Sequence, residues 1–371
     1  MKIPDLDQFI NIQHHLPAVG TWRSSVHVFD ERTAQAIRAA LASGRPLLVR
    51  GEPGTGKSQL ARAAAKVLGR KFLAQVIDAH TEIQDLWYRF DAVSRLGNAQ
   101  VLSATGKDKS EKEIESILDP QRYLSPGILW WAFAWEKAEQ HGCHHPQFKP
   151  DENVPGDVGQ GVVLLLDEID KADADLPNSL LETLDNGKFT VPWIQGAVGV
   201  DATNTTPRPL VVITTNEDRQ LPGAFVRRCL VLDLSLPDDT ETNLTEFLKD
   251  RAAFHFPSQN TKAELNARVE RDSKGKFLGA SRFDEDVLNE VAKQLFQDRQ
   301  QARSFGVTPP GQAEYLDILR VLDQLVPNDS QQQKELLKTI QPFALQKYPN
   351  MQKPEREKTV TETNITPSAD E

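Results

Sequence analysis

Eight consecutive residues have the types and spacing of a phosphate-binding loop. Residues 51–58 read Gly-Glu-Pro-Gly-Thr-Gly-Lys-Ser, which completes the pattern G-x-x-x-x-G-K-[ST]. Glycines let backbone N–H groups curl around a phosphate, and a helix that follows points its positive end at the same anion. We expect Lys57 to reach the β- and γ-phosphates of a nucleoside triphosphate and the Ser58 hydroxyl to bind Mg²⁺.

The segments on either side of this loop support the same interpretation. Residues 45–50 read as a short buried strand, and the Ala-rich residues 59–68 have apolar side chains at helical spacing before Gly69, a residue suited to a C-cap. Strand, glycine loop and helix thus follow in the order that a phosphate site requires. The predicted nucleotide-binding residues are Gly51, Glu52, Pro53, Gly54, Thr55, Gly56, Lys57, Ser58 and Gln59.

A second apolar strand ends in paired carboxylates. Residues 162–166 are Val-Val-Leu-Leu-Leu, and Asp167 and Glu168 follow directly. A strand in the centre of a sheet is apolar, and its acidic end can meet Mg²⁺ beside the phosphate loop. We expect Asp167 to hold the metal's water shell and Glu168 to act as the general base that polarises the attacking water. Three nearby carboxylates are predicted to be surface or helix-capping groups: Asp170, Asp173 and Asp175.

Three further polar residues follow the next strand. Asn216 ends the apolar strand 211–215, where its amide can position the lytic water; the alternative is a simple turn residue. Arg227 and Arg228 close the helix after it, and we expect one of them to act on phosphates bound by a neighbouring subunit. The alternative for these arginines is a favourable charge at a helix C-terminus.

The bulk composition is that of an ordinary globular protein. The chain has 371 residues, 39% hydrophobic and 26% charged, which is enough for two or more domains. No apolar run is as long as a membrane span and no secretory leader is recognisable, so a cytoplasmic location is the default expectation. The two cysteines offer no disulfide framework, and Cys143, His144 and His145 read as a solvated loop rather than a metal site. A net charge of −10 argues against nucleic acid as the main ligand.

Alternating strands and helices predict an α/β fold, a parallel, doubly wound sheet of the P-loop NTPase type followed by a small helical domain. We expect residues 126–135 to form a helix whose aromatic side chains pack in the core or at a subunit contact. Residues 97–119 are polar and read as an insertion or exposed loop. The expected organisation is an arm (1–28) that can cover the nucleotide base, the α/β domain (29–236) with an insertion (about 81–119) and a β-hairpin (about 185–200), a helical lid (237–348) and a disordered tail (349–371).

Taken in order, these motifs resemble an AAA+ ATPase of the MoxR type, within the wider group that includes dynein-like and McrB-like modules. The resemblance covers roughly residues 28–325 and is carried by residues 45–58, the acidic strand 162–170, residues 182–192 (Glu-Thr-Leu-Asp-Asn-Gly-Lys-Phe-Thr-Val-Pro), 214–216 and 221–229. It implies ATP and Mg²⁺ as ligands and a homo-oligomeric, hexameric ring. Arg228 would be the trans-acting finger with Arg227 supporting it, and Glu168 and Asn216 would serve hydrolysis. The hairpin at 185–200 would be the group's presensor insertion, and residues 81–119 would be its pore-facing helix-2 insertion.

One departure from the family pattern concerns the second sensor, a basic residue near the start of a lid helix. Residues 308–315 resemble that helix start but contain no basic residue. Arg282 is the nearest alternative by its sequence context, Gly-Ala-Ser-Arg, but its position differs from the common pattern. The second sensor therefore stays unassigned.

Three functions are compatible with this sequence. The leading interpretation is an ATP-driven chaperone or remodelling machine that assembles or activates a partner protein, which the resemblance suggests is a von Willebrand A-domain protein. The alternatives are a nucleotide-gated scaffold with slow hydrolysis and a motor of a nucleic-acid restriction or defence complex. The identity of the client, whether ring assembly needs nucleotide, and the role of the tail stay open.

Overall fold

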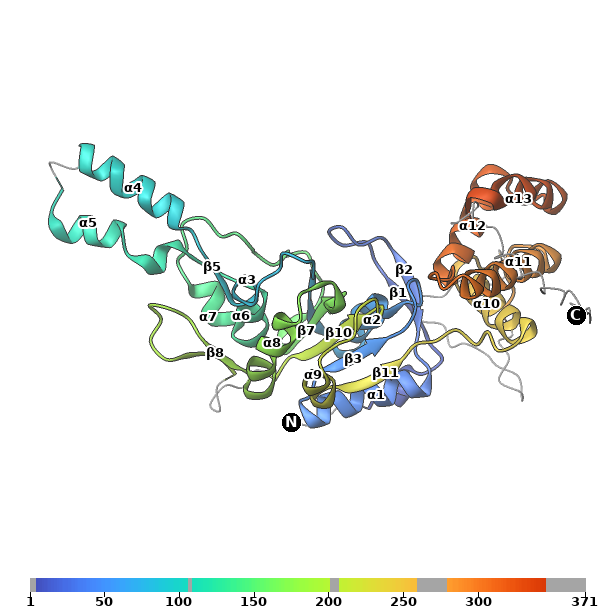
Figure 1. Ribbon diagram of the computed structural model, residues 1–371, viewed down its shortest axis with the longest axis horizontal. Helices are drawn as coiled ribbons and strands as arrows, with labels where there is room; N and C mark the ends of the chain where they lie inside the picture. Colours follow the sequence, from blue (N-terminus) through green and yellow to red (C-terminus); the bar gives the residue numbers. More distant parts are fainter. Residues whose placement is uncertain (1–4, 106–108, 201–206, 259–278, 345–371) are drawn as a thin grey trace, which may run out of the picture.

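A central sheet separates two helical extensions. The computed structural model describes residues 5–105, 109–200, 207–258 and 279–344. In Figure 1 helices α4 and α5 project from one end of the sheet, and helices α10–α13 form a separate bundle at the other end. The phosphate-loop motif lies between these two extensions.

The sheet has five parallel strands in the order β11-β3-β10-β7-β4. Their bounds are β3 (Leu47–Arg50), β4 (Arg70–Val76), β7 (Asp157–Asp167), β10 (Leu210–Thr215) and β11 (Leu230–Asp233). The chain leaves each strand through a helix before it pairs with the next one, as the alternating pattern predicts. The predicted parallel, doubly wound α/β fold is confirmed.

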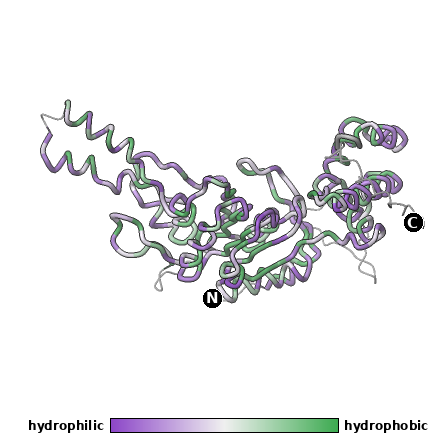
Figure 2. Tube along the Cα trace, in the orientation of Figure 1, coloured by the Kyte–Doolittle hydropathy of each residue, from purple (hydrophilic) through white to green (hydrophobic). Residues whose placement is uncertain are grey.

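Both faces of the central part of the sheet are buried, which explains the unbroken apolar runs at residues 47–49, 162–166 and 210–213 (Figure 2). Successive side chains point to opposite faces, so Leu47 and Val49 enter one core while Leu48 enters the other. The first core includes α1 (Glu31–Ser43) and α2 (Lys57–Leu68). The helices of the second core are α3 (Ile83–Trp87), α6 (Ile128–Phe133), α7 (Trp135–Gln140), α8 (Asp175–Asn186) and α9 (Gly223–Arg228). All six residues of α6 are buried, so its aromatic side chains are core residues as expected.

The N-terminal arm packs on α2. It contains a short 3-10 helix, η1 (Asp7–Phe9), and an antiparallel pair, β1 (Gln13–Leu16) and β2 (Ser25–Val28). Arg62 of α2 donates to the Pro17 carbonyl at 2.7 Å, and its guanidinium lies 5.2 Å from the Trp22 ring centroid. These contacts hold the arm beside the helix that follows the phosphate loop.

The region expected as an exposed loop between residues 97 and 119 is largely helical, which corrects that expectation. It is part of a unit made of β5 (Tyr88–Phe90), α4 (Ala92–Thr105), α5 (Glu111–Ile117), η3 (Pro120–Tyr123) and β6 (Leu124–Pro126). Neither α4 nor α5 has a buried residue, so the apolar periodicity that signals a packed helix is weak. The overlooked signal is at Ser110, which forms a capping box with Glu113 at the start of α5.

Residues 185–200 contain an antiparallel hairpin, with β8 (Lys188–Thr190) paired to β9 (Ala197–Gly199). Helix α8 ends at Asn186, and Gly187 adopts φ +64°, a left-handed conformation that suits glycine. The short 3-10 helix η4 (Ile169–Lys171) follows the acidic strand β7.

The C-terminal bundle has its own core. Its helices are α10 (Glu241–His255), α11 (Glu285–Ser304), α12 (Gln312–Leu325) and α13 (Ser330–Ala344). Leu244, Val291 and Leu319, from three of these helices, are fully buried together. The expected tail at 349–371 lies outside the described residues. None of the described helices is long and apolar enough to cross a membrane.

Candidate nucleotide site

The predicted site residues follow three neighbouring parallel strands. The phosphate loop begins after β3, Asn216 follows β10, and Asp167 ends β7. Since these strands are adjacent and parallel, their carboxyl ends lie at one edge of the sheet. The fold therefore brings together residues that are far apart in the chain. Gly51 and Asn216, for example, are more than 150 positions apart.

The phosphate loop is tightly folded around Lys57. The Lys57 ammonium donates to the carbonyls of Gly51 at 2.6 Å and Glu52 at 2.9 Å. Burial lowers the pKa of Lys57, and the nearby carboxylates of Asp167, Asp170 and Glu168 partly offset this effect. Lys57 opens α2, so its charge and the helix N-terminus are presented to the same anion.

Ser58 and Asp167, the two residues predicted to bind the metal, are in contact. The Ser58 hydroxyl lies 2.9 Å from both Asp167 carboxylate oxygens, across adjacent motifs 109 residues apart. Hydroxyl and carboxylate oxygens are the hard ligands that Mg²⁺ accepts, and it takes its other ligands from water and nucleotide phosphates. Among the described residues no group of three or more His, Cys, Asp or Glu side chains could hold a metal. The Ser58 hydroxyl and the Asp167 carboxylate fit a nucleotide-bound Mg²⁺, which would neutralise phosphate charge when bound.

Glu168 and Asn216 are in contact, as a base and a water-positioning amide would be. The Asn216 side-chain amide donates to the Glu168 carboxylate at 3.3 Å. The Lys171 ammonium lies 2.6 Å from the other Glu168 oxygen, and this hydrogen bond raises the pKa of Lys171. Glu168 has φ +60°, an uncommon conformation for a residue with a side chain, and one often found at functional sites.

Two residues that sequence reasoning did not place in the site organise these groups. The Thr214 hydroxyl donates to Asp167 and accepts from the Glu168 backbone N–H at 2.9 Å. Asp170, expected to be a surface or helix-capping group, is only 2% exposed and accepts from the backbone N–H of Asn216 at 3.4 Å and of Asp218 at 2.9 Å. The expectation of a surface or helix-capping group is therefore wrong for Asp170, because two backbone N–H groups of the turn after β10 donate to its carboxylate.

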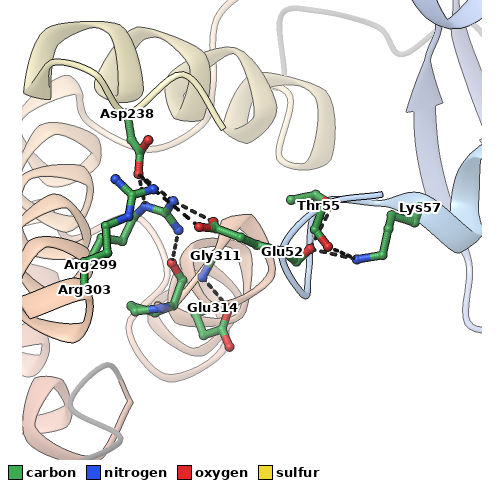
Figure 3. Close-up of polar contacts among 10 residues, drawn as sticks. Glu52, Thr55, Lys57, Asp238, Arg299, Arg303, Gly311 and Glu314 are labelled. Atoms are coloured by element: carbon green, nitrogen blue, oxygen red, sulfur yellow. Dashed lines mark hydrogen bonds and ion pairs between the residues drawn. The ribbon is translucent and has the colours of Figure 1, made fainter. Parts of the chain in front are cut away.

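A cavity of about 440 Å³ connects this cluster with the arm and the lid. Residues 53–59 line its phosphate end, while Val26 and His27 of the arm and Leu316 of the lid lie among the residues of the other end. Gln59 accepts from Ser25 of the arm at 2.8 Å, so its side chain holds the arm in place. Gly51 and Glu52 are not among the lining residues; their carbonyls bind Lys57, and the Glu52 side chain points to the lid (Figure 3).

Arg227 and Arg228 lie away from this cavity. Their helix α9 precedes β11, and Leu230 of β11 pairs with Leu47 at the beginning of β3, so both arginines are at the amino ends of the strands. The phosphate loop follows the opposite ends. Arg228 forms an ion pair with Asp185 at 2.7 Å. The Arg227 side chain is exposed and makes no hydrogen bond or ion pair with any residue in the described part of the chain.

The lid contributes no basic residue at the start of α12, where Gln312 and Ala313 line the cavity. Arg282 is bound to Asp323 of the lid at 2.7 Å and does not line the cavity. Two other lid arginines do line it, Arg251 from α10 and Arg320 from two turns along α12. A cation from the lid is thus available to a nucleotide, though not at the position where sequence reasoning sought it.

The fold and this constellation define a P-loop nucleoside triphosphatase. The comparisons narrow the class further: residues 46–229 match the family described as AAA domain (dynein-related subfamily), so this part of the chain is an AAA domain and the protein is an ATP-hydrolysing enzyme. A search of the curated proteins found no match. Among solved structures, a proposed ATPase from Cytophaga hutchinsonii is 13% identical over 84% of this chain and 79% of that chain, with a TM-score of 0.34, a likeness too low to support an argument.

Proposed function

We propose that this ATPase is a MoxR-type remodelling machine that uses Mg²⁺-ATP to assemble or activate a partner protein. In this proposal Lys57 and Ser58 bind Mg²⁺-ATP together with Asp167, and Glu168 and Asn216 direct water at the γ-phosphate. Hydrolysis then changes the relation between the α/β domain and the lid, and this motion is delivered to the client.

The placement of the arginines supports a ring, hexameric in the proposal. Arg227 and Arg228 lie at the edge of the sheet opposite their own phosphate loop, so they are better placed to serve a neighbouring subunit. The family resemblance names Arg228 as the finger, but its ion pair with Asp185 favours Arg227 for that role. A half-exposed ion pair contributes only about 0–1 kcal/mol, so both residues are tested below.

The exposed apolar side chains of the projecting helix α4 support the proposal of a protein client. Val93 is 83% exposed, Leu96 is 62% exposed and Val101 is 60% exposed, all on a helix that packs no residue into a core. Apolar side chains gathered on an exposed element indicate a protein-interaction surface. Figure 1 shows this helix at the end of the molecule away from the lid, where it can reach a partner without blocking the nucleotide site.

The test measures basal and client-stimulated ATP hydrolysis of Leu96→Glu, with a purified von Willebrand A-domain protein as the first client. Leu325→Glu is the matched control, because Leu325 is 64% exposed but lies on the lid. The proposal predicts normal basal hydrolysis in both variants and loss of stimulation in Leu96→Glu alone. Equal stimulation of both variants would remove α4 from client binding, and stimulation by DNA in place of protein would favour the nucleic-acid motor.

The variant Glu168→Gln distinguishes the scaffold alternative from the remodelling machine. A nucleotide-gated scaffold needs ATP binding and oligomer assembly, so this variant should keep its biological activity. A remodelling machine should lose it, because the work requires repeated hydrolysis. The lack of a basic residue at the start of α12 is the observation that favours the scaffold.

A further inference from the structure

A buried arginine joins the phosphate loop to the lid. Arg299, in the C-terminal third of α11, is 0% exposed and binds Asp238 through Nε at 2.8 Å and Nη2 at 2.5 Å. Its Nη1 donates to the Pro310 carbonyl at 2.6 Å, and its Nη2 also donates to the Glu52 carboxylate at 2.6 Å. Figure 3 shows the guanidinium between the linker residue Asp238 and the phosphate-loop residue Glu52.

A second arginine one turn along α11 binds the same two carboxylates. Arg303 lies 2.6 Å from Asp238 and 3.4 Å from Glu52. Burial acts to raise the pKa of Asp238, but the hydrogen bonds and charges of the two arginines outweigh this and lower the pKa. Two acids and two bases thus form a neutral cluster that spans the phosphate loop, the linker to the lid and α11.

The backbone of the phosphate loop also touches the lid. A Cβ on Gly54, which has φ +78°, would lie 2.9 Å from the Ala313 Cβ, and a Cβ on Gly311 would lie 2.7 Å from the Pro53 carbonyl. Residues 53 and 54 therefore pack directly against the N-terminal end of α12. The loop and the lid are therefore in close contact in this state, without room for a side chain between them.

Glu52 connects this cluster to the lysine of the site. Its carbonyl accepts from Lys57 at 2.9 Å and from Thr55 at 3.0 Å, while its carboxylate binds Arg299. A phosphate attracts the same Lys57 ammonium. Glu52 is thus the single residue between Lys57 and α11, a helix that contributes nothing to the lining of the cavity.

We propose that Arg299 is a positioning residue for ATP hydrolysis that couples nucleotide binding to the lid by holding Glu52 of the phosphate loop against α11. The second sensor of related enzymes is sought at the start of a lid helix, whereas this coupling acts from the side of the loop opposite the phosphates. The inference rests on the ATP-binding site and does not depend on the client.

The test compares hydrogen exchange with and without Mg²⁺-ATP in full-length protein that carries Glu168→Gln, so that ATP stays bound. The test variant adds Glu52→Gln, which keeps the shape of the side chain and removes its charge. Glu52 is only partly buried at 28% exposure, so this change is milder than removing the buried Arg299. Asp323→Asn is the matched control, because it removes one partner of the 2.7 Å lid ion pair with Arg282, which makes no contact with the phosphate loop.

In the parent and the control, ATP should slow exchange in both α2 and α11. In the Glu52→Gln variant, α2 should stay protected by ATP, while α11 should exchange about tenfold faster than in the ATP-bound parent, the scale expected for losing one charge-assisted hydrogen bond. A second variant, Arg303→Gln, should change α11 in the same direction. Equal ATP protection of α11 in the Glu52→Gln variant and the parent would overturn the proposal, as would loss of protection in α2. Absence of α2 protection in the parent would refute the nucleotide site itself.

Discussion

Replacing Thr214 with valine should uncouple nucleotide binding from hydrolysis. Valine has nearly the same shape as threonine but cannot hydrogen-bond, so the change removes the link between Asp167 and the Glu168 backbone. Thr214 is fully buried at 0% exposure, so its hydroxyl is the partner that the Glu168 N–H has within the protein. The Glu168 N–H then loses its partner at the residue whose φ is +60°.

The size of the effect follows from that unpaired donor. Leaving a buried N–H unsatisfied costs about 1–3 kcal/mol, and the left-handed conformation of Glu168 adds to the tendency of this turn to relax. If the same free energy is lost from the transition state, kcat should fall by roughly tenfold to a hundredfold. The KM for ATP should change little, because Lys57 and Ser58 are untouched.

The assay is steady-state ATP hydrolysis together with thermal unfolding, and Thr183→Val is its control. Thr183 is also a buried threonine, at 1% exposure, and accepts from the Trp87 indole at 3.0 Å. Its replacement should lower stability by a similar amount and leave kcat unchanged. If Thr214→Val keeps normal kcat, or if both variants lose kcat equally, the hydroxyl bridge has no specific part in positioning Glu168.

Two further predictions concern the loop–lid contact and acid stability. Gly54→Ala should weaken ATP binding about tenfold or more because of its close approach to Ala313, whereas Gly306→Ala, with a similar positive φ and nothing within 4 Å, should keep normal affinity by calorimetry. Burial, together with nearby Arg251, lowers the pKa of His27 to about 3 and of His255 to about 4. The unfolded chain therefore binds protons below about pH 6.5 that the folded chain does not, so stability should fall as the pH drops, by up to about 2 kcal/mol per histidine at pH 5. Urea unfolding at pH 7 and pH 5 tests this: His255→Gln should reduce the loss, and an unchanged loss would contradict the assignment.

The sequence alone was sufficient to predict the site residues that belong to short motifs. Lys57, Ser58 and Asp167 belong to contiguous patterns whose spacing reflects the geometry of a phosphate site, and the parallel sheet follows from the order of strands and helices. The structure brings these residues together at one edge of the sheet, as that order requires.

The residues that sequence reasoning missed depend on distant partners. Arg299 contacts Glu52, 247 positions away, and the polar surroundings of Arg299 in the sequence give no hint of its burial. Asp170 resembles its exposed neighbours Asp173 and Asp175 until the turn after β10 supplies donors to it. Residues 97–105 of α4 give no helix signal in the sequence and are typical of an insertion or exposed loop, because α4 packs nothing into a core and packing creates the apolar period by which helices are recognised.

The most direct test of a shared catalytic site is to mix two variants that are each inactive alone. Arg227→Ala lacks the proposed finger but keeps Glu168, whereas Glu168→Gln keeps the finger but lacks the base. If the site lies between subunits, mixed rings regain complete sites and hydrolysis recovers to about a quarter of the wild-type rate per subunit for random mixing. Repeating the experiment with Arg228→Ala identifies which arginine acts. No recovery with either arginine variant, although each alone is inactive and each binds ATP, would contradict a ring ATPase with shared sites.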